Sequence, residues 1–140
     1  MEANTVLTGN LPTPQLAHLP SDLTDGVFQA GCPSRTVLDH ITSKWGVLIL
    51  VALSEGEHRW SDLRRRAEGI SEKMLAQTLK TLERDGLVLR KAKPVIPPHV
   101  DYSLTDRGYE LTALLVPLVT WAYDNADDIL SGQPWPTSTS

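Results

Sequence analysis

The chain has few of the residues that bind metals or form covalent cross-links. It contains one cysteine and four histidines, and these show no spacing typical of metal ligands. A single cysteine also cannot form a disulfide within its own chain. The sequence contains no Gly-rich phosphate loop, no nucleophile elbow and no paired acid and base. We therefore expect no catalytic residues, no metal, no cofactor and no enzymatic activity.

Long apolar segments are also missing. No apolar run approaches the ~18 residues that a membrane-spanning helix needs, so no membrane partner is expected. The first residues, MEANTVLTGNLP, lack a basic segment followed by an apolar one. This argues against a signal peptide and favours a cytoplasmic location. The 140 residues, with 6% aromatics and many aliphatic side chains, suffice for one domain with a modest core.

Positive charge is scarce overall but concentrated in one region. The net charge is −4, yet residues 58–93 carry ten Lys or Arg against five Asp or Glu, a local charge of +5. The remaining residues carry three Lys or Arg against twelve Asp or Glu, which gives −9. A basic middle between acidic flanks is the charge distribution expected of a nucleic-acid-binding surface.

Domain boundaries follow from where periodic patterns begin and end. Residues 1–31 contain scattered prolines and glycines without a sustained period, which predicts an N-terminal extension that is arm-like or partly ordered. The periodic patterns fall within residues 32–130, the predicted domain. Residues 131–140 are expected to form a frayed tail.

Three short helices are predicted in the first half of this domain. Pro33 suits the first turn of a helix over residues 34–42. A second helix, over residues 44–54, has one apolar stripe, made of Trp45, Leu48, Ile49, Ala52 and Leu53. A short strand over residues 58–60 and a third helix with Ser61 as its N-cap follow.

The segment from Gly69 to Thr105 is the most informative part of the chain. A helix that starts after the N-cap Ser71 has an inner apolar stripe of Leu75, Leu79 and Leu82. Its outer stripe is polar and consists of Lys73, Gln77, Lys80 and Arg84. Gly86 supplies a left-handed stop.

Two strands should follow this helix. Residues 87–92 form the first, and a loop with three prolines leads to the second, in which Val100, Tyr102 and Leu104 alternate with outward-facing Asp101 and Ser103. A helix followed by a β-hairpin is the outline of a winged helix. The predicted fold class is therefore α+β, mostly helical, a winged helix-turn-helix.

The last predicted helix, residues 106–130, begins after the cap Thr105 and should be kinked by Pro117. Between Leu111 and Ala122 it is apolar on nearly all sides, and a domain this small can cover only one face. A second copy of the chain is the simplest cover, and the N-terminal arm is the alternative. The expected interface residues are Leu38, Leu114, Leu115, Leu118 and Trp121.

The polar face of the helix after Ser71 has the side chains that double-stranded DNA requires. The major groove accepts one helix and presents distinguishable base edges. Gln77 can pair with adenine, while Lys73 and Lys80 can reach guanine or phosphate. The amino end, with Ser71 and Glu72, usually points into the groove. Contacts to the DNA backbone and from the hairpin are expected from Arg59, Arg64, Arg65, Arg66, Arg90, Lys91 and Lys93.

Taken together, the motifs resemble the HxlR-type family of bacterial winged-helix transcriptional regulators, relatives of the MarR type. The matching residues span about 32–122. They are Cys32-Pro33, Lys44-Trp45, Arg59-Trp60-Ser61-Asp62-Leu63, Gly69-Ile70-Ser71, Lys73, Leu75, Leu82 through Val88, Arg90, Pro97-Pro98, Val100, Tyr102-Ser103-Leu104-Thr105, Gly108 and Trp121. The chain departs from the family pattern at Trp60, Asp62, His99 and Asp101, where phenylalanine, glutamate, arginine and glutamate are usual.

This resemblance implies a homodimer, built through the first and last helices, that places two recognition helices in successive major grooves of a near-palindromic operator. It also implies a bacterial, nucleoid-associated protein. Repression is expected rather than activation, because a small protein without a further domain can most simply block polymerase. A protein-docking winged helix is the rival class, and near-absence of salt-dependent DNA binding would favour it.

Cys32 is a candidate sensor. It precedes Pro33 at a helix start, where free amides and Arg35 should lower the pKa of its thiol. Family members with cysteine here resemble sensors of quinones, aldehydes or oxidants, so the inducer would be a reactive electrophile. The alternatives are a structural Cys32 or a small-molecule inducer in a cavity lined by Trp45, Trp121 and Tyr123.

Overall fold

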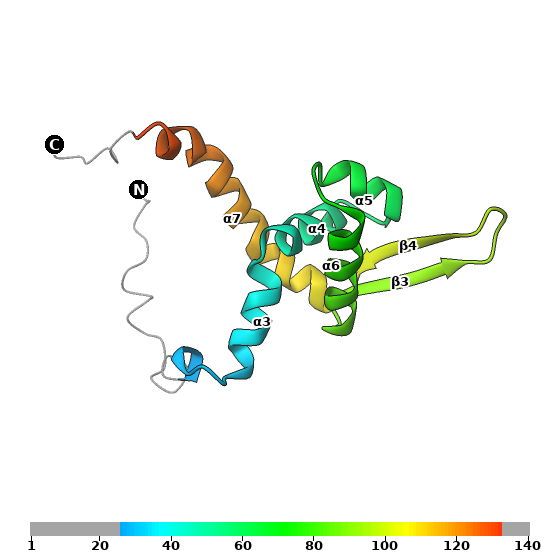
Figure 1. Ribbon diagram of the computed structural model, residues 1–140, viewed down its shortest axis with the longest axis horizontal. Coiled ribbons are helices and arrows are strands. Elements are labelled where there is room, and N and C mark those ends of the chain that lie inside the picture. Colours follow the sequence, from blue (N-terminus) through cyan, green and yellow to red (C-terminus); the bar gives the residue numbers. More distant parts are fainter. Residues whose placement is uncertain (1–25, 133–140) are drawn as a thin grey trace, which may run out of the picture. The chain divides into compact units, whose positions relative to one another are not determined.

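The computed structural model describes residues 26–132, coloured in Figure 1. Most of the predicted N-terminal extension and of the tail lies outside these residues. The chain divides into two units, residues 1–39 and 40–140, and each is described by itself. Among residues 26–132, no single helix is both long and apolar enough to cross a membrane.

The described part of the first unit begins with helical residues 26–28, and a turn then leads into helix α3, Pro33–Thr42, which continues into the second unit. Pro33 is the first helical residue, as predicted. The backbone amide of Cys32 donates to the carbonyl of Gln29 at 3.1 Å, and the carbonyl of Cys32 accepts from the amide of Arg35 at 3.0 Å. Cys32 therefore occupies the position just before the helix.

Helix α4, Lys44–Ser54, is the central helix of the second unit. Ser43 caps it by accepting a hydrogen bond from the amide of Gly46 at 3.1 Å. Ile49, Leu50 and Leu53 are completely buried, whereas Leu48 is 38% exposed. The predicted stripe was thus wrong about Leu48 and omitted Leu50. Leu50 is buried because α4 is packed by α6, α7 and β4 together, so its buried surface is wider than one stripe.

Three strands form one antiparallel sheet in the order β2–β4–β3. Strand β2, His58–Arg59, has two residues, and helix α5, Trp60–Arg66, begins directly after it. Ser61 is therefore not the N-cap that the sequence predicted. Arg59 holds that position, and its amide donates to the carboxylate of Asp62 at 3.4 Å. Pairing with β4 sets this boundary, since Arg59 is the last paired residue of β2.

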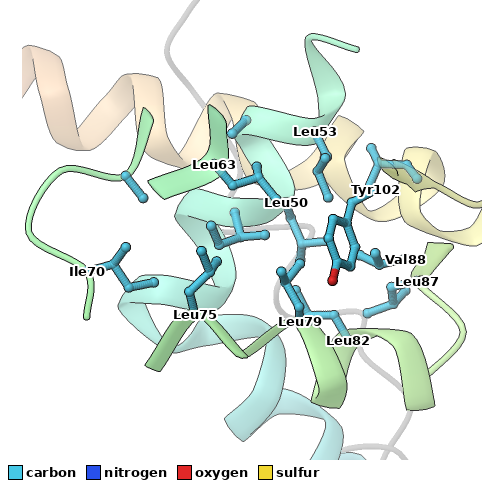
Figure 2. Packing of buried hydrophobic residues seen from close by; sticks show 14 of the residues in the cluster. Leu50, Leu53, Leu63, Ile70, Leu75, Leu79, Leu82, Leu87, Val88 and Tyr102 are labelled. Carbon is cyan, nitrogen blue, oxygen red and sulfur yellow. The ribbon is translucent and has the colours of Figure 1, made fainter. Parts of the chain in front are cut away.

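Helix α6, Glu72–Arg84, follows the turn after α5, and strands β3, Val88–Lys93, and β4, His99–Leu104, form the hairpin. Figure 1 shows this hairpin extending from the helices, with residues 94–98 at its far end. Leu75, Leu79 and Leu82 of α6 are buried with Leu87 and Val88 from the hairpin's base, as Figure 2 shows. The inner stripe predicted for this helix is confirmed.

Helix α7, Asp106–Leu130, closes the chain. The hydroxyl of Thr105 accepts from the amide of Gly108 and donates to the carbonyl of Gly86 at 2.6 Å, which ties the start of α7 to the end of α6. A side chain at Gly108 would lie 2.3 Å from the carbonyl of Leu87, so only glycine allows this approach. The fold is a mostly helical winged helix-turn-helix, as the sequence predicted.

Candidate DNA-binding surface

The outer face of α6 is polar and exposed. Lys73, Gln77, Lys80 and Arg84 are all exposed, on the side opposite the buried leucines. Within residues 26–132, none of these four side chains forms an ion pair or a side-chain hydrogen bond. The helix therefore presents three uncompensated cations and one amide to solvent, all on one rigid element.

The amino end of α6 has a fixed geometry. The hydroxyl of Ser71 accepts a hydrogen bond from the amide of Met74 at 3.0 Å, as expected of an N-cap. Glu72 accepts a hydrogen bond from Arg64 at 3.2 Å, which links α5 to α6. Both Ser71 and Glu72 are exposed. Both side chains therefore lie on the solvent-exposed amino end of α6.

The three arginines of α5 are exposed, but each has a carboxylate partner on its own chain. Arg64 pairs with Glu72, and Arg65 pairs with Asp62. Arg66 donates to both carboxylate oxygens of Glu55, with its Nε at 2.9 Å from Oε1. This contact raises the pKa of Arg66 and lowers the pKa of Glu55, because the side-chain hydrogen bond favours both charged forms.

The hairpin carries two kinds of cation. Arg90 and Lys91 are exposed and form no ion pair with any residue in the described ranges. Lys93 lies 3.3 Å from the carboxylate of Asp101. Arg59, on the short strand β2, is exposed and stands in register with Asp101.

The alternation of β4 predicted that Asp101 faces outward, and this prediction was wrong. The residue is 9% exposed. β4 is the central strand, so Asp101 is flanked by Arg59 on one side and Lys91 on the other. The side chains of Lys93 and His99 approach its two oxygens at 3.3 and 3.5 Å. Two basic side chains of its own hairpin, rather than solvent, contact this carboxylate.

Cys32 is partly exposed and has the lowered pKa that the sequence predicted. The largest cause is a hydrogen bond from the side chain of Ser34, followed by the backbone amide of Ser34. The amide and charge of Arg35 add to it. The predicted effects of free amides and of Arg35 are present, but the Ser34 hydroxyl was overlooked.

The residues proposed for a dimer interface do not all lie on exposed surface. In α7, Leu114 is 71%, Leu118 54% and Trp121 53% exposed, and Leu38 of α3 is 41% exposed. Leu115 is only 5% exposed and belongs to the core of its own chain. Its assignment to an interface was therefore wrong, because α4 already covers that side of α7. Tyr123 is 84% exposed, so it does not line a closed ligand cavity among residues 26–132.

One contact had no signal in the sequence. Nδ1 of His40 lies 2.7 Å from Oδ2 of Asp85, the residue that caps the carboxyl end of α6. The two residues are 45 positions apart, and neither stands in a recognisable motif. Within residues 26–132, no group of three metal-ligating side chains comes together.

These elements define the class of protein. Two helices joined by a turn, the second with a free polar face, followed by a basic β-hairpin, form the winged helix-turn-helix of DNA-binding transcriptional regulators. More particularly, residues 40–129 match the model of the HxlR-like helix-turn-helix family, and the chain belongs to that family.

Its relatives agree with this assignment. The chain is 54% identical over 114 residues to the HTH-type transcriptional regulator YtfH of Escherichia coli strain K12, covering 81% of this chain and 90% of that protein. Among solved structures, the transcriptional regulator YtfH from Salmonella typhimurium is 52% identical, with a TM-score of 0.72 over 76% of this chain and 96% of that one. The redox regulator HypR in its oxidised form is 34% identical, with a TM-score of 0.63 over 67% of this chain and 97% of that one.

Proposed function

We propose that the protein is a homodimeric repressor that binds a near-palindromic operator through two α6 helices and releases it when Cys32 is modified. The observation that carries the DNA-binding part is the outer face of α6. Its three cations and Gln77 are exposed and unpaired, while the leucines on its opposite side hold its rotation fixed. Such a helix can enter a major groove without first breaking contacts of its own.

The roles of individual residues follow from their positions. Gln77 is suited to a bidentate contact with adenine, and Lys73 and Lys80 to guanine or phosphate. Arg90 and Lys91 are free to contact the backbone beside the groove. Arg59 and the α5 arginines are further candidates for phosphate contacts. Two copies would neutralise ~6–10 phosphates, so affinity should fall steeply with salt.

The exposed apolar face of α7 supports a dimer. Leu114, Leu118 and Trp121 lie on one long helix, and burying them against a second copy removes apolar area that residues 26–132 leave exposed. Leu38 would join them. A symmetric dimer explains how one short helix per subunit can read an operator, since two helices one turn of DNA (~34 Å) apart read two half-sites at once.

Cys32 is the proposed sensor. Its lowered pKa favours the reactive thiolate. An electrophile could alkylate it, or an oxidant could join it to Cys32 of the partner subunit, in which case the two thiols give up two protons and two electrons to the oxidant. The 34% identity to a redox regulator solved in its oxidised form supports this proposal. Modification would change the spacing of the two α6 helices and so release the operator.

Three experiments test DNA binding, sensing and dimerisation separately. Duplexes selected from a randomised library by the purified protein give a defined operator. Lys73→Ala should weaken binding to this duplex, whereas Arg107→Ala, which removes an exposed cation from α7, should not. If both variants bind as the wild type does, the outer face of α6 does not bind DNA.

The sensor is tested by adding diamide or methylglyoxal before the binding measurement. Operator release is expected for the wild type and not for Cys32→Ser. Equal responses from both proteins would remove the sensor role and leave DNA binding intact. Sedimentation at several concentrations checks the dimer, and Leu118→Glu should shift the mass to that of one chain.

A further inference from the structure

The hairpin between β3 and β4 ends in an apolar tip. Ile96 is 99% exposed, the highest value among the large apolar side chains of residues 26–132, and Val95 beside it is 48% exposed. Figure 1 shows this turn at the end of the hairpin that lies farthest from the helices. Ile96 therefore contributes nothing to the core, and folding stability does not explain why an apolar side chain stands at this position.

The tip is also restricted in conformation. Three of the five residues from 94 to 98 are prolines, and each proline fixes one backbone torsion. A loop with few accessible conformations loses little entropy when it becomes ordered on a ligand. The side chain of Ile96 is thus preorganised, and a partner that buries it loses little conformational entropy of the loop.

The residues behind the tip indicate what that partner is. Arg90 and Lys91 on β3 are exposed and have no ion pair among the described residues. Positive charge on the strand favours a polyanion, while the tip itself has no charge and no free side-chain donor. A hairpin with an apolar tip and basic residues behind it matches the minor groove of duplex DNA. Phosphates line the edges of this groove, and apolar side chains can wedge between its base steps.

We propose that Ile96 is an apolar wedge that enters the minor groove beside the major groove occupied by α6 and partly unstacks one base step. This inference rests on the proposed function, because α6 must first place the hairpin against a duplex. Unstacking is least costly at pyrimidine–purine steps. Ile96 therefore gives the protein a sequence preference at flanking positions where no side chain hydrogen-bonds to a base.

The test uses the selected duplex with 2-aminopurine at the flanking steps, whose fluorescence rises when the base unstacks. Wild type and Ile96→Leu should raise the fluorescence on binding, and Ile96→Ser should not. Ile96→Ser should also bind about tenfold more weakly, the factor that corresponds to ~1.4 kcal/mol. Because Ile96 is fully exposed, the variant folds as the wild type does.

Salt dependence separates the wedge from ordinary electrostatic attraction. Ile96→Ser should leave the slope of log affinity against log salt unchanged, whereas Lys91→Ala should reduce it by about 0.9 for each phosphate that the lysine neutralises. Leu89→Ser removes a half-exposed apolar side chain nearer the base of the same hairpin, and should change neither affinity nor fluorescence.

The outcomes are distinguishable. If Lys73→Ala weakens binding but Ile96→Ser matches the wild type in affinity and fluorescence, the wedge is wrong and the proposed DNA binding stands. If Ile96→Ser loses affinity without any fluorescence change in the wild type, the tip rests on the surface of the duplex and the wedge is again wrong. If the wild type selects no duplex at all, the proposed function fails and the wedge fails with it.

Discussion

The cations of α5 and α6 belong to the same helix-turn-helix but differ in their partners. Each α5 arginine contacts a carboxylate of its own chain, the pairs being Arg64–Glu72, Arg65–Asp62 and Arg66–Glu55. The α6 cations Lys73, Lys80 and Arg84 form no ion pair with any residue between 26 and 132. Two stretches of equal apparent basicity are therefore not equivalent.

This difference indicates that the charges of α5 and α6 have different roles. A paired arginine must give up its carboxylate before it grips a phosphate, and the carboxylate then repels that phosphate. An unpaired lysine binds a phosphate without losing an ion pair and without a nearby carboxylate that repels the phosphate. We interpret α5 as the helix whose charges hold the motif together, through Glu55 at the end of α4 and Glu72 at the start of α6. The charges of α6 are available for DNA.

The largest expected effect concerns the inner face that orients α6. Leu79→Ala should lower the free energy of unfolding by ~2–5 kcal/mol, because it leaves a cavity beneath the helix. Gln77→Ala, on the exposed face, should change it by no more than about 0.5 kcal/mol. Urea unfolding measures both. Similar values for the two variants would mean that α6 is rotated differently, and the contrast with α5 would lose its basis.

The next largest effect concerns base recognition by the exposed face of α6. Gln77→Ala should reduce discrimination at roughly one base pair of the operator by ~1–3 kcal/mol, because the variant has no amide to pair with adenine. Affinities for the selected duplex and for singly substituted duplexes measure this. A uniform loss across all duplexes would instead place Gln77 against the DNA backbone.

A direct comparison of the two helices comes from salt dependence. Lys80→Ala should reduce the slope of log affinity against log salt by about 0.9 for each phosphate that Lys80 neutralises. Arg65→Ala should reduce it less, because the charge of Arg65 is already balanced by Asp62. Binding titrations over a range of salt concentrations give both slopes. A larger change of slope for Arg65→Ala than for Lys80→Ala would contradict the roles proposed for α5 and α6.

The smallest effect concerns the pair between Arg66 and Glu55. Both side chains are about half exposed, so removing the pair with Glu55→Gln should cost only ~0.2–1 kcal/mol of stability. The folded-state pKa of Glu55 is lowered. Ionised Glu55 therefore contributes to the free energy of unfolding above its unfolded-state pKa of ~4.3. This contribution is lost as the pH falls through its folded-state pKa.

Thermal unfolding of wild type and Glu55→Gln between pH 3 and 7 checks the sign, with convergence of the two proteins expected at the acidic end. The same variant frees Arg66 and should modestly strengthen DNA binding. Weaker binding would indicate that Arg66 must be held by Glu55 to reach the DNA.

Local signals made much of this fold predictable. Ser71, Gly86 and Thr105 act within a few residues of their own position, so the beginning and end of α6 and the start of α7 followed from the sequence. The inner and outer stripes of α6 followed from helical periodicity. The N-cap of α5 was misplaced because the pairing of β2 with β4, distant in sequence, decides where that helix starts.

The candidate site was less predictable where partners are distant. Asp101 looked like an outward residue of an alternating strand, and only its place on the central strand buries it among basic side chains. Leu115 looked like its exposed neighbours, and only the packing of α4 against α7 assigns it to the core.

The sequence by itself determined which segments become helices and strands, which face of α6 is polar, and the winged-helix class, because these depend on periodicity and on capping within a few residues. The tertiary structure alone decided which cations are paired, as in Arg66 with Glu55, and which side chains reach the end of α6, as in His40 with Asp85. Ion pairs of this kind form between residues that only folding brings together, and no local pattern records them.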